Sequence, residues 1–144
     1  MFKDPSRSAT VVLIAAVVCL LLRHALFAHG AGFVAAQVAA ALLMLWARLT
    51  FGLRSFHAAA SPTEGALVTT GPYRFVRHPI YAAILLFVWA GVASNASLVS
   101  LLTALTATGA IATRIATEER LVVARYPEYA AYAARTKRVI PFVL

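Results

Sequence analysis

Residues 71–82, which read GPYRFVRHPIYA, place polar side chains directly before a stretch of apolar sequence. His78 precedes Pro79. The residue before a proline is disfavoured in the helical conformation, whereas proline itself favours the first position of a helix. We therefore predict that His78 is the N-cap of a helix and that Tyr81 lies three residues along on the same side. The backbone N–H groups of such a helix end could bind a carboxylate or a phosphate.

The same residues have a simpler interpretation. Arg74, Arg77, His78 and Tyr81 could anchor the chain at a membrane–water interface, as basic and aromatic residues commonly do. Their spacing does not separate anchoring from ligand binding, so both interpretations stay open at this point.

A second pair of charged residues follows further along the chain. Arg114 and Glu118 are four residues apart, so in a helix they share one face, at the end of an apolar stretch. As an exposed salt bridge they would contribute under about 1 kcal/mol. Against a ligand, the same pair could supply a cation for an anionic substrate and an anion for an ammonium group. The neighbours Glu119 and Arg120 would face elsewhere.

Other kinds of chemistry find no support in the sequence. It has no Gly-x-Ser-x-Gly, no His-Glu-x-x-His and no Gly-rich nucleotide loop after a strand. Cys19 is the single cysteine, which leaves no disulfide framework and no zinc spacing. His24 and His29 are better explained as interface residues than as metal ligands, so no metal site is predicted. An enzyme built from this chain would position groups around a reactive cofactor.

Composition indicates a membrane protein. Hydrophobic residues make up 62% of the 144 residues and charged residues only 12%, against about half and a quarter in soluble domains. Four apolar segments are expected to be transmembrane helices, at about 9–28, 33–51, 80–93 and 97–113. The third would cover only about 21 Å. The last two therefore form either a tight hairpin, which we favour, or a re-entrant pair. We predict one all-α integral membrane domain over residues 1–144.

The net charge is +8, and the basic residues are distributed along the sequence as in a membrane protein. In the four-helix arrangement nearly all Lys and Arg fall on one side, and only Arg23 falls near the other. The positive-inside rule then puts both termini and the 52–79 connection in the cytoplasm. Anionic lipid headgroups account for the excess charge, and a nucleic-acid partner is not expected.

The segments between and after the helices are patterned. The second half of the 52–79 connection is too apolar for a disordered linker, so it should fold back onto the helices. From Glu118 onward, apolar and charged residues alternate at helical spacing, which predicts an amphipathic continuation of the fourth helix or an interfacial helix. Pro127 should begin a short second helix within YPEYAAYAARTK.

Three motifs in this order, LVTTGPYRFVRHPIYAA, RIATEERLV and YPEYAAYAARTKRVIPFV, resemble the isoprenylcysteine carboxyl methyltransferase and phospholipid methyltransferase superfamily of integral membrane enzymes. The resemblance covers about residues 65–143. It implies an S-adenosylmethionine-dependent methyltransferase, with S-adenosylhomocysteine as product, whose cofactor is bound on the cytoplasmic side by a loop (65–81) and a tail (114–143). Carried over by motif, the cofactor shell would be Leu67, Val68, Tyr73, His78, Pro79, Ile80, Tyr81 and Glu118.

The resemblance also implies a role for Arg114, which occupies the position of an arginine that contacts the lipid-borne substrate in relatives that methylate prenylcysteine. We infer that Glu118 pairs with the amino group of the cofactor and that His78 and the helix end face its carboxylate or ribose. The expected acceptor is a lipophilic molecule with a prenylcysteine-like carboxylate. Alternatives are N-methylation of a phospholipid amine, S-methylation of a small thiol, or a membrane scaffold without catalysis. Departures at Ala82, Ala83 and Tyr126-Pro127 leave the subfamily open, and the sequence does not predict an oligomeric state.

Overall fold

The structure, a computed structural model, describes residues 5–52 and 66–140. Helices account for most of the described residues, and no strand is present among them: α1 (Pro5–Leu22), α2 (Ala31–Phe51), the 3-10 helix η2 (Gly71–Arg74), α3 (Pro79–Ser94), α4 (Leu98–Arg125) and α5 (Tyr129–Arg135). Of these, α1, α2 and α4 are long and apolar enough to cross a membrane. The prediction of an all-α membrane protein is confirmed. At 16 residues, α3 is about 24 Å long, shorter than the hydrocarbon core.

The first helix differs from the predicted segment at both ends. It begins at Pro5 instead of residue 9 and ends at Leu22 instead of residue 28. His24 has a left-handed backbone with φ 55°. The N–H groups of His24 and Ala25 donate to the carbonyls of Leu21 and Leu20, which is the Schellman pattern that closes a helix. The predicted end was wrong because an apolar composition does not reveal a backbone turn.

The fourth helix continues well beyond the apolar segment. It starts with a capping box, in which the Ser97 side chain accepts from the Ser100 N–H and the Ser100 hydroxyl accepts from the Ser97 N–H. It then runs to Arg125, twelve residues past Thr113, so the predicted continuation of the helix is confirmed. The part of α4 after Thr113 carries charged side chains and lies beyond the apolar segment 97–113 that was predicted to cross the membrane. After Pro127, α5 begins at Tyr129.

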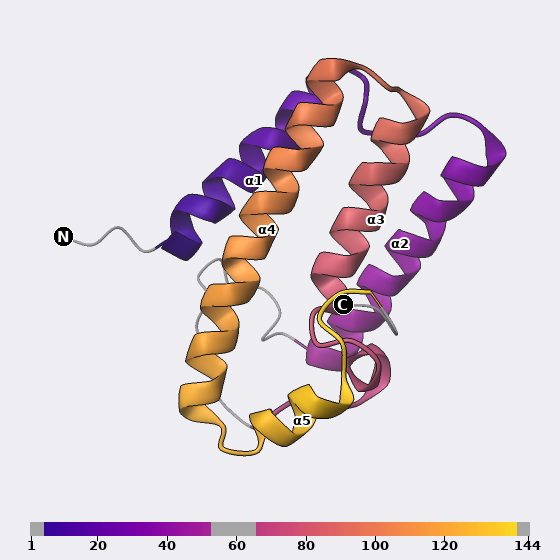
Figure 1. Cartoon of the computed structure of the whole chain (residues 1–144). Coiled ribbons are helices and arrows are strands. Elements are labelled where there is room, and N and C mark those ends of the chain that lie inside the picture. Colours follow the sequence, from indigo (N-terminus) through magenta and orange to yellow (C-terminus); the bar gives the residue numbers. More distant parts are fainter. Residues whose placement is uncertain (1–4, 53–65, 141–144) are drawn as a thin grey trace.

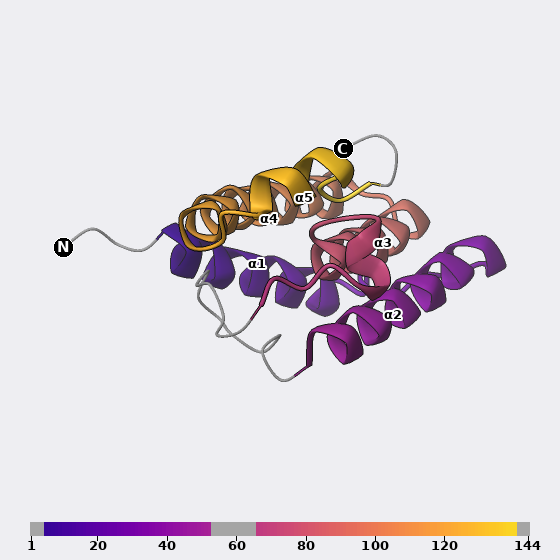
Figure 2. The same ribbon diagram turned by 90° about the horizontal axis from the view of Figure 1, so that it is seen from below.

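The helices pack in two pairs. Among the described residues the most extensive packing joins α1 to α4 and α2 to α3, and α3 lies between α2 and the α1–α4 pair (Figure 2). A short turn at Asn95–Ser97 connects α3 and α4, as predicted. The two helices nevertheless diverge from this turn and contact each other less than either contacts its main partner (Figure 1). The longer α4 reaches the opposite end of the molecule, where α5 also lies, whereas the shorter α3 does not extend as far (Figure 1).

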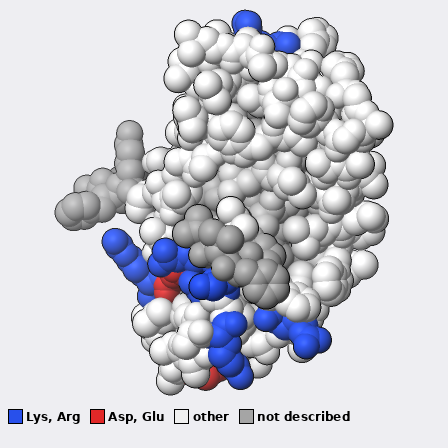
Figure 3. Space-filling view, turned by 45° about the vertical axis from the view of Figure 1, so that its right-hand side comes forward, with Lys and Arg blue, Asp and Glu red and all other residues white. Residues whose placement is uncertain are grey.

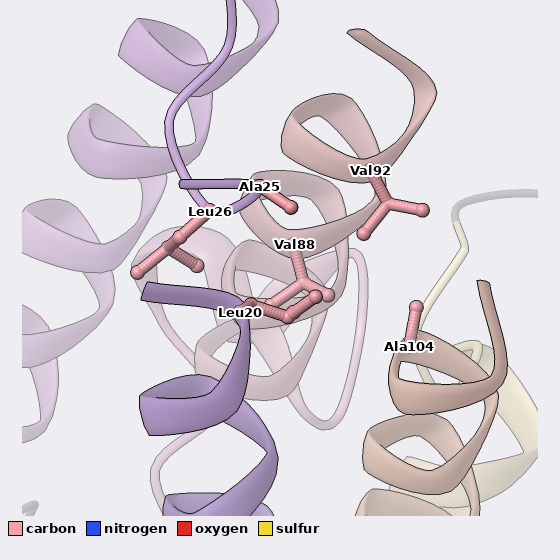
Figure 4. Close-up of a cluster of buried hydrophobic side chains, with 6 residues drawn as sticks. All are labelled: Leu20, Ala25, Leu26, Val88, Val92 and Ala104. Atoms are coloured by element: carbon pink, nitrogen blue, oxygen red, sulfur yellow. The ribbon is translucent and has the colours of Figure 1, made fainter. Parts of the chain in front are cut away.

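The end that carries the α3–α4 turn is tightly packed. An apolar cluster joins α1, the residues after it, α3 and α4 (Figure 4): Leu20, Ala25, Leu26, Val88, Val92 and Ala104. Beside it, the buried Gln37 of α2 donates from Nε2 to the carbonyls of Leu26 (2.8 Å) and Phe87 (3.0 Å). Its Oε1 accepts from the Ala28 N–H at 3.0 Å. One amide therefore ties α2 to α3 and to the connection that precedes α2.

The close approach of Gly91 to the backbone of Leu26 predicts that two helical glycines, Gly91 and Gly109, respond differently to substitution by alanine. A methyl group at Gly91 would lie 2.2 Å from the carbonyl oxygen of Leu26, a backbone atom that cannot turn away. We expect Gly91→Ala to lower the free energy of unfolding by about 1–3 kcal/mol, the usual cost of overpacking.

Gly109→Ala is the matched control, because nothing lies within 4 Å of the added carbon. There alanine should be neutral or stabilise the helix by up to about 1 kcal/mol. Thermal unfolding midpoints in detergent would measure both changes. Equal midpoints for the two variants would contradict the close packing of Gly91.

Candidate functional site

The loop before α3 is held against the tail after α5 by backbone hydrogen bonds. The N–H of Arg77 donates to the Lys137 carbonyl (2.7 Å), and the N–H of His78 donates to the Arg138 carbonyl (2.9 Å). Val76 and Lys137 form a parallel bridge. Residues 75–78 and 137–138 thus lie side by side, although they are about sixty residues apart in sequence, and the loop does fold back as predicted.

Tyrosines strengthen this junction. The hydroxyl of Tyr132 donates to the carbonyl of Tyr73 at 2.6 Å, and Tyr129 and Tyr132 pack edge to face with ring centroids 5.8 Å apart. Burial raises the pKa of Tyr73 and Tyr129, and it raises the pKa of Tyr132 to about 12. These phenols keep their protons at neutral pH, and the hydroxyls of Tyr129 and Tyr132 act as hydrogen-bond donors.

His78 is the N-cap residue of α3, as predicted, and its side chain makes no cap hydrogen bond. Its ring lies instead between two carboxylates of α4. Nε2 is 3.3 Å from Oε1 of Glu119, and Nδ1 is 3.8 Å from Oε2 of Glu118. The ring centroid is 5.8 Å from that of Tyr81, so the two residues share one side of the helix start. The position before Pro79 thus brings an imidazole to the acidic pair.

Tyr81, Arg114 and Glu118 form one hydrogen-bonded group. The Tyr81 hydroxyl accepts from Nε of Arg114 at 2.7 Å and donates to Oε1 of Glu118. Nη2 of Arg114 also donates to Oε1 of Glu118, at 3.3 Å, along the shared face of α4. The guanidinium carbon lies 5.7 Å from the centre of the Tyr81 ring. The two sequence motifs that contain these residues therefore meet through side chains.

The first helix supplies two more contacts, which sequence reasoning missed. Nη1 of Arg114 donates to Oγ1 of Thr10. The same nitrogen lies 3.3 Å from the carbonyl oxygen of Ser6 and 3.4 Å from Oγ of Ser6. Arg114 is only 6% exposed and Ser6 is fully buried. The available signal was a pair of hydroxyl residues four apart at the start of a helix that is apolar from Val11 onward.

Glu119 faces a different set of groups. It accepts from Nε of Arg77 (3.0 Å), from Nε of Arg138 (3.1 Å) and from the Tyr129 hydroxyl (3.4 Å). Burial opposes its ionisation, but the hydrogen bonds and charges of His78 and Arg77 outweigh burial and lower its pKa from 4.5 to about 2. Its contribution to stability is therefore complete above about pH 4.5 and is lost as the pH falls through about 2.

The structure also separates the two arginines of the loop. The side chain of Arg77 is 11% exposed, and its Nη1 donates to the carbonyls of Ala133 (2.9 Å) and Thr136. Arg77 is thus an internal link between loop, α4 and tail. Arg74 is exposed, with its guanidinium 5.1 Å from the Phe75 ring centre. Interfacial anchoring, which the sequence left open for both, suits only Arg74.

For the remaining residues expected in the cofactor shell, the structure defines no hydrogen bond to this group. Leu67 and Val68 are half-buried in the extended segment before η2. Tyr73 is buried, and its ring packs against Phe51 of α2 at 5.5 Å. Pro79 is buried at the start of α3, and Ile80 beside it is half-buried. The first residue of the expected loop, Gly65, and the tail beyond 140 lie outside the described residues.

Basic side chains gather around this end of the molecule, and the apolar length of the bundle is nearly free of them on the face that Figure 3 shows. Arg23 follows α1 at the opposite end. The distribution of charge along the bundle is thus as uneven as the sequence predicted.

Comparison with known proteins matches residues 25–129 to the family model for phospholipid methyltransferases. A similar curated protein is the cobalt-zinc-cadmium resistance protein CzcN of Cupriavidus metallidurans, with 35% identity over 79 residues, or 54% of this chain. The chain covers 37% of that relative's length. No solved structure matches. The matched range contains Tyr81, Arg114 and both carboxylates but not α1.

Removing the charge of Glu119 should release the tail. In Glu119→Gln the guanidinium of Arg77 stays largely buried but loses its anionic partner, which is costly. We expect trypsin to cleave after Arg135, Lys137 or Arg138 about tenfold faster than in the unchanged protein. Mass spectrometry of the C-terminal fragments, below the unfolding temperature, would measure the rate.

Glu128→Gln is the control for this experiment, because Glu128 is an exposed carboxylate at the start of α5. It should leave the cleavage rate within about twofold of the starting value. If the two variants were cleaved equally fast, Glu119 would not hold the tail.

Proposed function

Since the chain belongs to the phospholipid methyltransferase family, within the superfamily of membrane methyltransferases that includes the isoprenylcysteine carboxyl methyltransferases, we propose that it transfers a methyl group from S-adenosylmethionine to a lipophilic acceptor, a prenylcysteine-like carboxylate. The observation that carries this proposal is the hydrogen-bonded group of Tyr81, Arg114 and Glu118. It places one cation and one carboxylate side by side at the charged end of an apolar bundle.

The residues present suit the cofactor. S-Adenosylmethionine, when bound, supplies a methyl group on a positively charged sulfur, and it also carries an ammonium and a carboxylate. The Glu118 side chain keeps 23% exposure, so its carboxylate can accept from the ammonium. His78 and the N–H groups at the start of α3 would face the cofactor's carboxylate or ribose. Leu67 and Val68 offer apolar contacts for the base, and Tyr73, Pro79, Ile80 and Tyr81 complete the proposed shell.

Arg114 would contact the acceptor anion. A carboxylate is already negatively charged at neutral pH, so its methylation requires no general base. The chain's task is then to hold the two reactants about 3–3.5 Å apart in a pocket that excludes water, which can account for much of a rate enhancement. The buried guanidinium would fix the acceptor's position because charge-assisted hydrogen bonds are strong and directional.

The family's description favours the alternative acceptor, a phospholipid amine. An amine must lose a proton, and the sequence suggested Glu119, Glu128 or water as the proton acceptor. Glu119 is occupied by Arg77, His78 and Arg138, and Glu128 is exposed on α5. The charge of Arg114 would also repel an ammonium group. These contacts support a carboxylate, or the thiolate of a small thiol, over an amine.

We further propose that this end of the bundle faces the cytoplasm. Basic residues are concentrated there and Arg23 lies at the other end, which is the asymmetry that the positive-inside rule relates to orientation. Membrane lipids, and anionic headgroups in particular, would surround the basic rim.

The cofactor assignment predicts a specific loss of affinity. In Glu118→Gln the ammonium of S-adenosylmethionine loses its anionic partner while the side chain keeps its shape and an oxygen that can accept from Tyr81. We expect the Kd from calorimetry in detergent to rise about tenfold or more. Glu128→Gln should leave the Kd unchanged. Absence of binding to the unchanged protein, or equal affinity in Glu118→Gln, would refute the assignment.

The acceptor assignment is tested by comparing the methylation of different candidate substrates. With labelled S-adenosylmethionine, we expect methylation of N-acetyl-S-farnesylcysteine and little of phosphatidylethanolamine or a small alkyl thiol. Arg114→Lys keeps the charge but not the planar fork, and Arg114→Gln removes the charge. The KM for the farnesylcysteine should therefore be higher in Arg114→Lys than in the unchanged protein, and higher again in Arg114→Gln. In Arg114→Gln we expect a rise of at least about tenfold.

Arg120→Gln is the control, since Arg120 is exposed on the same helix. Preferred methylation of phosphatidylethanolamine would favour the amine alternative. Methylation of the farnesylcysteine that is equal in Arg114→Gln and Arg120→Gln would refute the role of Arg114.

A further inference from the structure

We infer that the first helix, α1, forms part of the acceptor site, and that Thr10, together with Ser6, is a positioning residue that orients Arg114 toward the acceptor's carboxylate. This inference rests on the proposed role of Arg114. It concerns a helix that lies outside residues 25–129, the range matched by the family model.

The guanidinium of Arg114 is held from three helices at once. Nε donates to Tyr81 of α3, Nη2 donates to Glu118 of α4, and Nη1 donates to Thr10 of α1. A guanidinium is planar and rigid, so bonds at all three nitrogens define both its position and its plane. Without the α1 contact, only Nε and Nη2 would be held, and the plane of the guanidinium could tilt about the line that joins these two nitrogens.

The Thr10 hydroxyl is itself oriented. It has a single hydrogen, which it donates to the carbonyl of Ser6 at 2.8 Å, one turn earlier in α1. Its oxygen lone pairs are then directed to acceptor roles, and Nη1 of Arg114 is the donor that it meets. Ser6, fully buried, adds its carbonyl and hydroxyl oxygens at 3.3 and 3.4 Å from the same nitrogen. The α1 contact is therefore a built arrangement of two residues.

The contacts from α1 are neutral, which suits an anion-binding site. Oxygens of hydroxyl and carbonyl groups satisfy the guanidinium without cancelling its charge. The residues of α1 include no acidic side chain. Glu118 lies on the α4 side, where we assign it to the cofactor's ammonium. The α1 contacts therefore orient the guanidinium and leave its positive charge available to attract an acceptor carboxylate.

The test uses binding, with N-acetyl-S-farnesylcysteine as the anionic probe and its C-terminal carboxamide as the neutral probe. Both are titrated by calorimetry into the full chain in detergent with saturating S-adenosylhomocysteine. Thr10→Val removes the hydroxyl and keeps the shape of the side chain. We expect its Kd for the carboxylate probe to rise about tenfold and its Kd for the carboxamide to change less than about twofold.

Two further variants separate positioning from general disruption. Thr10→Ser restores the hydroxyl and should bring the carboxylate Kd back to within about twofold of the original. Ser8→Ala is the matched control, an exposed hydroxyl residue on the same helix, and should change neither Kd. The Kd for S-adenosylhomocysteine should stay constant in all three variants, because none of these residues belongs to the proposed cofactor shell.

The possible results distinguish the two proposals. If the unchanged protein binds the carboxylate probe and Thr10→Val binds it equally well, the inference is wrong and the proposed function stands. If Thr10→Val weakens both probes alike, Thr10 has only a structural role and the inference is again wrong. If the unchanged protein binds neither probe, the proposed acceptor class fails and the inference fails with it.

Discussion

The buried guanidinium of Arg114 is the constraint on which the site end of the molecule depends. A charge removed from water is tolerated only where hydrogen-bond acceptors surround it. The acceptors come from α1, α3 and α4, so these helices must converge around one side chain. The same requirement accounts for the hydroxyl groups of Ser6 and Thr10 beside Arg114, at the start of the first helix. The same residue, Arg114, meets this structural need and carries the anion-binding role that we propose.

The two neighbouring carboxylates of α4, Glu118 and Glu119, have different roles. Successive residues of a helix point about 100° apart, so Glu118 and Glu119 face largely different partners and share only His78 among the described residues. Glu118 joins Arg114 and Tyr81 and stays partly exposed, which suits contact with a ligand. Glu119 is engaged by Arg77, His78 and Arg138 and fastens loop and tail to α4. His78 lies between them and is therefore positioned by both.

The far end of the bundle complements this arrangement. Gln37, Gly91 and the short α3–α4 turn hold the helices closely together there through uncharged contacts. From that packed end α3 and α4 diverge (Figure 1), and toward the site they are joined by a smaller apolar cluster of Tyr81, Ile111 and Ile115, by polar side chains and by the tail. Apolar packing thus continues along the bundle, and the charged groups gather beside it at the site end.

Features that depend on near neighbours in the chain were predictable. Apolar segments indicated the membrane class, a proline after His78 marked the start of α3, and four-residue spacing paired Arg114 with Glu118. Recognition of the three motifs also identified the superfamily. In each case the physical signal, a backbone preference or a side-chain periodicity, is contained within a few consecutive residues.

Features that depend on contacts between residues far apart in the sequence were not predictable from the sequence. Ser6 and Thr10 meet Arg114 across more than a hundred residues, and Arg77 meets Glu119 across 42. The early end of α1 depends on the left-handed turn at His24, which apolar composition does not encode. Apolar helices can pack in several ways at similar cost, so the choice of partners is made by the few buried polar groups, and these are satisfied only once the chain is folded.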